Sequence, residues 1–214
     1  MTTMKRDTKT QVLVASLSLF NEQGEPNTTT NDIANEADIS PGNLHYHFKK
    51  KANLVEALLA EFQADVRRAL DPPTGDEITI DDFWAFLHLL LEVLTAYGFL
   101  FRDIETLVST YPKVGHALKG FSKGLTAIMQ LYIEALRRND VLDVDDREVP
   151  VMSRNLVVIV LFSERFDEIS GLASPVDVSA LRIARSVLGI LLPHSSEEAA
   201  ALIEELTERY SEHK

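Results

Sequence analysis

Cysteine is absent from this 214-residue chain. Its absence excludes disulfide bonds, thiolate metal sites and cysteine nucleophiles, and it fits a reducing compartment. Long apolar segments are missing too: the longest unbroken run, Leu156 to Phe162, has seven residues, whereas a membrane-spanning helix needs about 20. The first ten residues contain no apolar core of a signal peptide. We therefore expect a cytoplasmic protein with no membrane partner.

Motifs of catalysis are also missing. The chain contains no glycine-rich phosphate loop, no Gly-x-Ser-x-Gly and no His-Glu-x-x-His. His45 and His47 are two residues apart, which places them on different faces of a helix and not in a chelating pair. The paired carboxylates at 145–146 and 204–205 are typical of solvated surface. We expect no enzymatic activity, no bound metal and no cofactor.

Patterns of β-structure are the third absence, since neither strict alternation of apolar residues nor an Asn-Gly hairpin occurs. Apolar residues recur instead at helical spacing, and the hydrophobic content of 45% is sufficient for a core. The sequence predicts an all-α protein. The expected helices span residues 5–23, 29–37, 41–48, 53–71, 81–97, 101–111, 114–139, 150–171, 176–192 and 195 onward.

Charge is distributed unevenly along the chain. The net charge is −12, but residues 1–70 hold eight Lys/Arg against nine Asp/Glu, which leaves the remaining residues with a net −11. Lysine and arginine lie at positions 5, 6 and 9 and at 49–51, and such a locally basic face can bind phosphates, although ordinary solvated lysines look the same. The run Asp71-Pro72-Pro73-Thr74-Gly75 is the best domain boundary. We expect an N-terminal domain of residues 1–52, a connecting helix over 53–71 and a larger domain over 75–214.

Residues 28–51 form the most informative stretch, two short helices joined by a tight turn. Thr29 and Asp32 match a capping box at the start of the first helix. Asp38 lies in the turn, while Ser40 and Pro41 suit the N-cap and first position of the second helix. Such a unit is a helix-turn-helix, whose second helix enters the major groove of DNA.

The side chains of this stretch suit contacts with DNA. Hydroxyls at the start of the first helix can bind phosphate, the first turn of the second helix faces the groove, and donors and cations follow. The candidate contacts are Thr28, Thr29, Thr30, Ser40, Pro41, Gly42, Asn43, His45, Tyr46, His47, Lys49 and Lys51. Periodicity alone leaves open a purely structural three-helix unit.

The same stretch resembles the DNA-binding domain of the TetR family of bacterial transcriptional regulators. The shared pattern runs Thr…Ile-Ala…Ala…Ser…Gly…Leu…His-Phe…Lys…Leu, and the match extends over about residues 9–60. The resemblance implies phosphate contacts at Thr28, Tyr46, His47 and Lys51. It implies contacts with bases and backbone at Ser40, Pro41, Gly42, Asn43 and His45.

Two positions depart from the family's pattern. Asp38 stands where the family usually has glycine, and His45 where it usually has tyrosine. Asp tolerates a left-handed backbone better than most residues, so the turn is expected to survive. The chain is expected to be a ligand-responsive repressor on a palindromic operator. The alternative is a ligand-binding or protein-interaction module whose helix-turn-helix no longer binds DNA.

For the second part of the chain the resemblance implies dimerisation and the binding of a small effector. We expect homodimerisation through residues 150–171 and 176–192, which are apolar on several sides, although both could be core helices alone. We expect a hydrophobic or amphipathic effector, although for any single aromatic residue core packing is the commoner role. The candidate pocket residues are Trp84, Phe101, Arg102, Phe121, Asn155, Phe162 and Phe166.

Overall fold

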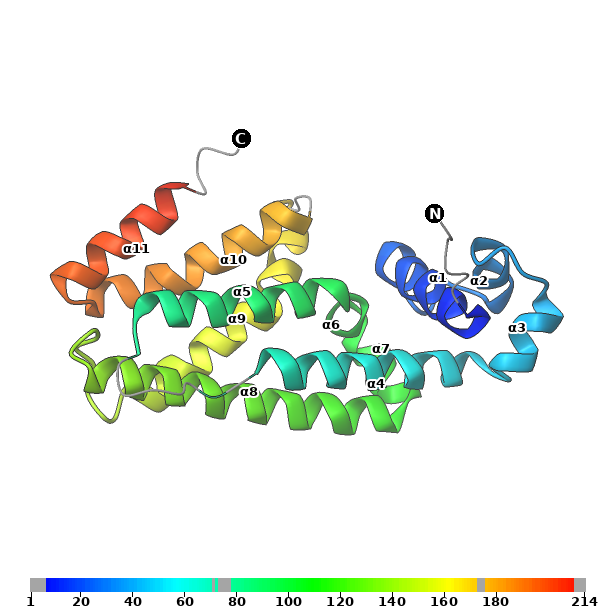
Figure 1. Ribbon diagram of the computed structural model, residues 1–214, viewed down its shortest axis with the longest axis horizontal. Coiled ribbons are helices and arrows are strands. Elements are labelled where there is room, and N and C mark those ends of the chain that lie inside the picture. Colours follow the sequence, from blue (N-terminus) through cyan, green and yellow to red (C-terminus); the bar gives the residue numbers. More distant parts are fainter. Residues whose placement is uncertain (1–6, 71, 73–77, 173–175, 210–214) are drawn as a thin grey trace. The chain divides into compact units, whose positions relative to one another are not determined.

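The computed structural model describes residues 7–70, 72, 78–172 and 176–209. All elements of regular secondary structure within these residues are helices, which confirms the predicted all-α fold (Figure 1). The helices are α1 (Thr8–Gln23), α2 (Thr30–Glu36), α3 (Pro41–His47), α4 (Lys51–Ala69), α5 (Ile80–Ala96), α6 (Phe99–Arg102), α7 (Ile104–Thr110), α8 (Pro112–Arg138), α9 (Val149–Ile169), α10 (Val176–Leu191), the 3₁₀ turn η1 (Leu192–His194) and α11 (Glu197–Arg209).

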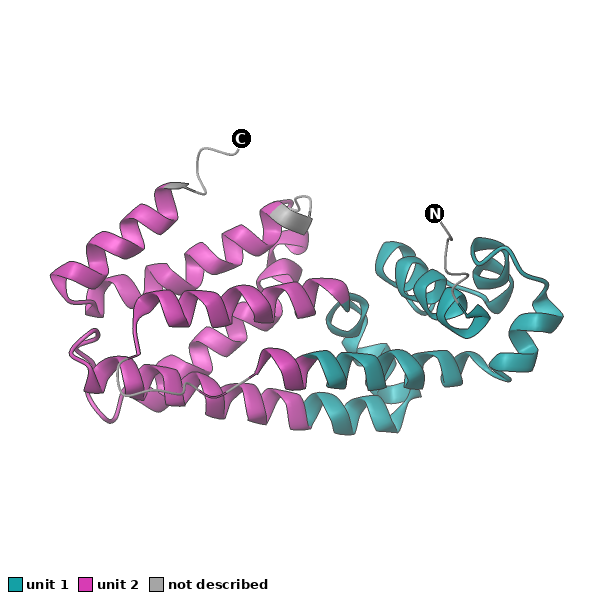
Figure 2. Ribbon diagram, in the orientation of Figure 1, with its two compact units in different colours: residues 1–65, 97–119 teal, residues 66–96, 120–214 magenta. Residues whose placement is uncertain are grey.

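The chain divides into two compact units (Figure 2). Unit 1 comprises Met1–Asp65 and Tyr97–Lys119, and unit 2 comprises Val66–Ala96 and Gly120–Lys214. Unit 1 thus combines the N-terminal helices with a segment from the middle of the chain, which sequential domain boundaries do not describe. The expected boundary at 71–75 lies, apart from Pro72, outside the described residues, as do the cations at 5 and 6.

The core of unit 1 joins α1 to α4. Phe20 and Ile33 are fully buried, and Leu44 and Phe48 are nearly so. Phe62 of α4 is fully buried and packs edge-on against Tyr97, with ring centroids 5.5 Å apart. Phe20 of α1 packs on Phe99 of α6 with ring centroids 5.3 Å apart, and Phe62 of α4 packs on Phe101 of α6 at 5.9 Å, so α6 links α1 to α4.

The turn between α2 and α3 is a Schellman motif. The backbone N–H of Ile39 donates to the carbonyl of Ala34 at 3.0 Å, and that of Asp38 to Asn35 at 3.1 Å. This motif requires a left-handed residue after the helix, and Asp38 has φ 52°. The turn therefore forms with aspartate where glycine is the usual residue.

Replacing Asp38 by glycine is expected to raise the free energy of unfolding by about 0.5–1 kcal/mol, because glycine adopts the left-handed region without a Cβ clash. Urea denaturation measures the change. Asp38→Asn, which removes the charge but tolerates the same backbone, should lie close to the original chain. A loss of stability in Asp38→Gly would show that the entropy of glycine in the unfolded chain outweighs the relieved strain.

Unit 2 consists of the end of α4, α5, the part of α8 from Gly120 onward, and α9–α11. A second capping box opens α5, in which the Asp82 carboxylate accepts from the N–H and hydroxyl of Thr79 at 2.9 and 2.8 Å. Phe86 stacks on Tyr132 of α8 with centroids 4.5 Å apart. Arg182 of α10 donates to Asp167 of α9 at 2.6 Å, which fixes these two helices to each other.

The prediction of one continuous helix over residues 101–111 is wrong, because Asp103 separates α6 from α7. The backbone of Asp103 has φ −98° and ψ 23°, outside the α region, and its carboxylate turns toward α1. Among the described residues, no helix combines the length and apolarity needed to cross a membrane.

Candidate nucleic-acid interface

The capping box at the start of α2 is present as predicted. The Asp32 carboxylate accepts from the N–H and hydroxyl of Thr29 at 2.8 and 2.6 Å, and the Thr29 hydroxyl accepts from the Asp32 N–H at 3.2 Å. The hydrogen bonds from Thr29 lower the pKa of Asp32 below its usual 3.8. The ionised carboxylate therefore stabilises the fold above about pH 3.8, and this contribution is lost as the pH falls through the lower folded pKa. Thr29 is exposed at a helix N-terminus, where a phosphate can bind.

Thr28, one of the candidate phosphate contacts, is only 1% exposed. Its hydroxyl donates to the carbonyl of Gly24 at 2.8 Å, which ties the loop before α2 to the end of α1. Thr29 and Thr30 remain at the helix terminus, exposed and half-buried respectively.

The first turn of α3 is presented to solvent. Ser40 is the N-cap, and its hydroxyl accepts from the N–H of Asn43 at 3.2 Å. Pro41, Gly42, Asn43 and Ser40 are all exposed. A methyl group added at Gly42 would meet nothing nearer than the Ser40 hydroxyl at 3.9 Å, so packing within the protein does not require glycine there.

The second turn of α3 carries the aromatic candidates. Tyr46 is 82% exposed, which is unusual for so large a side chain, and its ring meets the half-buried ring of His47 edge-on at 5.3 Å. His45 is exposed beside them. Lys49 and Lys50 follow α3 and are exposed as well. Hydrogen-bond donors and cations therefore extend the exposed surface that begins at the first turn of α3.

Lys51 differs from the two lysines before it. Its ammonium lies 2.9 Å from the Glu25 carboxylate and also donates to the Glu25 backbone carbonyl. The side chain of Glu25 is 4% exposed and that of Lys51 24%. The cation that the resemblance assigned to a DNA phosphate is therefore engaged inside unit 1, between the start of α4 and the loop after α1.

Glu25 also accepts a hydrogen bond from the hydroxyl of Tyr111 at 2.6 Å. Burial raises the pKa of Tyr111 above its usual value, and the hydrogen bond and negative charge of Glu25 raise it further. Tyr111 remains a neutral donor, so the carboxylate has one cationic and one neutral partner. The Glu25 N–H completes the set by donating to the Asp103 carboxylate at 3.1 Å.

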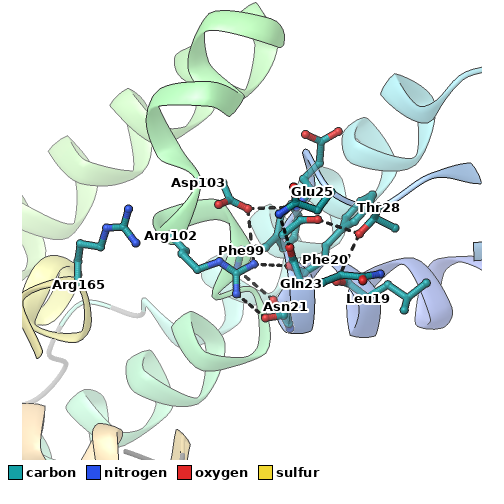
Figure 3. Close-up of polar contacts among 12 residues, drawn as sticks. Leu19, Phe20, Asn21, Gln23, Glu25, Thr28, Phe99, Arg102, Asp103 and Arg165 are labelled. Atoms are coloured by element: carbon teal, nitrogen blue, oxygen red, sulfur yellow. Dashed lines mark hydrogen bonds and ion pairs between the residues drawn. The ribbon is translucent and has the colours of Figure 1, made fainter. Parts of the chain in front are cut away.

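Arg102 extends this polar network to the end of α1 (Figure 3). Its guanidinium donates to the backbone carbonyls of Asn21 and Phe20 at 2.6 and 2.5 Å. A cation at these carbonyls complements the negative end of the helix dipole. Arg102, a candidate effector anchor, thus directs its donors to the C-terminus of α1.

The remaining pocket candidates lie on α5, α6, α8 and α9. Phe101 belongs to unit 1, and Trp84 and Phe121 lie in α5 and α8 of unit 2, half-buried and buried. The other three candidates, Asn155, Phe162 and Phe166, are exposed on α9. In the single chain these last three side chains therefore lie on the surface of α9.

The exposed face of α9 is strongly apolar. Its large hydrophobic residues recur at helical spacing, with Phe166 66% and Ile169 80% exposed. We call this set the α9 stripe, and it comprises Val151, Val158, Phe162, Phe166 and Ile169. Leu172 and Val178 are exposed apolar residues just beyond it, at the α9–α10 connection and in α10. An exposed apolar surface of this kind is typical of sites of protein association or ligand binding.

Comparison with known proteins decides the family. A model described as "Bacterial regulatory proteins, tetR family" matches residues 12–58, and a model described as "Bacterial transcriptional repressor" matches residues 61–203, more than half of the chain. The chain belongs to the TetR family. It is accordingly a DNA-binding transcriptional regulator, and α2 and α3 are its helix-turn-helix.

Individual relatives agree with this family. A TetR-family transcriptional regulator from Marinobacter aquaeolei VT8 is 28% identical, with a TM-score of 0.85 over 95% of this chain and 98% of that one. The regulator TtgR of Pseudomonas putida is 32% identical over 41% of each chain. The probable regulator YttP of Bacillus subtilis is 29% identical over 43% of this chain and 44% of its own. The matches to these two curated relatives therefore span less than half of either protein.

Sequence reasoning missed the polar network in which Glu25 contacts Lys51, Tyr111 and Asp103. Glu25 follows a glycine in a loop, where an acidic residue is ordinarily solvated, and its partner Tyr111 lies 86 positions away. The Asp103 contact spans 78 positions. A hint was available at Arg102 and Asp103, adjacent opposite charges within a largely apolar segment.

Proposed function

We propose that this TetR-family chain is a ligand-responsive repressor that binds a near-palindromic operator as a homodimer. The observation that carries the proposal is the exposed first turn of α3, held by the Ser40 cap above a buried Leu44. A rigid helix with its N-terminal side chains free can enter the major groove without rearrangement.

Contacts with the DNA backbone come from the residues that surround this turn. Thr29 offers a phosphate site at the N-terminus of α2, and Tyr46 offers a hydroxyl. Lys49 supplies a cation next to α3. Gly42 allows close approach of the DNA, which accounts for glycine at a position where the protein itself leaves room. Lys51 is left out of this set because Glu25 holds its ammonium.

Dimerisation is assigned to the α9 stripe, together with the exposed face of α10. Phe166 and Ile169 are the most exposed members of the stripe, and burying them supplies the apolar area that a stable association needs. A two-fold axis through such a surface places the same residues on both sides. Each DNA-binding head then reads one half-site, and the operator is near-palindromic.

Effector binding is assigned to unit 2. Its buried and half-buried aromatic residues include Phe83, Phe86, Trp84, Tyr132 and Phe121. Sites lined by such residues favour hydrophobic or amphipathic ligands with few polar groups. The net charge of −11 beyond residue 70 opposes a polyanionic effector.

The proposal is tested by gel shift and fluorescence anisotropy on the DNA flanking the protein's own gene. Specific binding is expected, and Tyr46→Ala should weaken it about tenfold on every sequence because a phosphate contact carries no base preference. Lys49→Ala should lower the slope of log K against log salt by about one. Absence of specific binding at low salt by a folded dimer would favour the module that no longer binds DNA.

A further inference from the structure

The first turn of α3 offers few groups that can read a base. Of its four exposed residues, Pro41 presents a ring without donors and Gly42 presents no side chain. The hydroxyl of Ser40 accepts from the Asn43 N–H at 3.2 Å and serves as the helix cap. Only Asn43 carries both a donor and an acceptor on one planar group.

The carboxamide of Asn43 is also uncommitted. Its backbone N–H is used by the cap, but within residues 7–70, 72, 78–172 and 176–209 no hydrogen bond engages its side chain. Leu44, the next residue, is buried and fixes the orientation of the turn. The amide is therefore held on a rigid helix and faces solvent with its hydrogen-bonding capacity intact.

The chemistry of base edges selects the partner of such a group. In the major groove adenine presents an acceptor at N7 next to a donor at N6, which pair with the amide NH₂ and the amide oxygen of Asn. Guanine presents two acceptors, N7 and O6, so the amide oxygen would face O6 without a proton between them. Cytosine presents a single donor at N4. A carboxamide in this position thus discriminates in favour of adenine.

The two commonest readers of guanine are missing from the same helix. Arginine and lysine make the commonest specific contact with guanine, and residues 41–47 contain neither. Lys49 and Lys50 lie beyond the end of α3, whose last residue is His47. Nothing in the first turn therefore offers the two parallel donors that guanine requires.

We propose that Asn43 is a specificity-determining residue that reads one adenine in each operator half-site through a bidentate amide contact. The inference deepens the proposed function and rests on it, because it requires α3 to lie in the major groove. An A·T pair is therefore expected at one position of each half-site, and a symmetry-related pair in the other half.

Selection from a random DNA pool, followed by sequencing, tests this assignment. The full-length chain should enrich a near-palindrome with a fixed A·T pair in each half. Asn43→Ala should reduce discrimination at that pair by about tenfold or more and leave the other positions unchanged. Asn43→Gln should retain adenine, and Asn43→Arg should shift the same position toward G·C. Asn35→Arg, on the exposed surface of α2, is the matched control for added charge and should not change the consensus.

The outcomes distinguish a failure of the Asn43 assignment from a failure of the proposed function. A consensus that is the same for the unaltered chain, Asn43→Ala and Asn43→Arg overturns the Asn43 assignment and leaves the proposed function standing. A fixed G·C pair at the position that responds to Asn43 overturns the assignment as well. If the folded chain enriches no sequence, the proposed function fails, and this inference fails with it.

Discussion

Replacing Lys51 by methionine is expected to lower the free energy of unfolding by about 3 kcal/mol. The substitution leaves the Glu25 carboxylate buried without its cation, and breaking a buried pair from one side costs about 3–5 kcal/mol. The low end applies because Lys51 is about a quarter exposed and Tyr111 still donates to Glu25. Urea denaturation measures the loss, since methionine keeps most of the packing of the lysine stem.

The salt dependence of DNA binding distinguishes this structural role from a phosphate contact. Lys51→Met should leave the slope of log K against log salt unchanged, whereas Lys49→Ala should lower it by about one at unchanged stability. Adding Glu25→Gln to Lys51→Met should recover much of the stability, because the buried charge is then removed from both sides. If Lys51→Met kept full stability and lowered the slope of log K against log salt, Lys51 would be assigned to a DNA phosphate instead.

Replacing Phe166 by glutamate is expected to convert the dimer to a folded monomer and to weaken operator binding by at least about 100-fold. The side chain is two-thirds exposed in the single chain, so the substitution costs the isolated subunit little. In the dimer it would bury two carboxylates across a two-fold axis. Loss of the second DNA-reading head removes a gain in affinity of about 10²–10⁴.

Analytical ultracentrifugation and gel shift measure the two effects on the same sample. Leu89→Glu is the matched control, because Leu89 is 50% exposed on α5, outside the α9 stripe. That variant should remain dimeric and bind the operator as the original chain does. A dimeric Phe166→Glu protein with altered effector response would instead support the sequence-based placement of Phe166 in a pocket.

Local features of the helix-turn-helix were predictable because their partners lie close in sequence. The Thr29–Asp32 box and the Ser40 cap each join residues three apart, so composition and spacing are sufficient. The left-handed Asp38 was also foreseeable from its position in the turn. For such features the neighbouring residues are sufficient to determine the interaction, whatever the rest of the chain does.

Which side chains are exposed was less predictable, because the hydrophobicity of a residue does not show which way its side chain faces. Phe162 and Phe166 fit core, pocket or interface equally well from spacing alone. Their exposure on α9 excludes the core of the single chain. In the same way Thr28 and Thr29 are adjacent and chemically identical, yet one is buried and the other exposed.

The sequence alone determined that the chain is all-helical, where most helices begin and end, and that residues 28–51 form a helix-turn-helix. These properties follow from periodicity and from caps that span a few residues. Only the tertiary structure decided what Lys51 and Arg102 bind, since Glu25 lies 26 positions from Lys51 and Asn21 lies 81 positions from Arg102. Contacts of that separation depend on how the helices pack, and no local pattern records them.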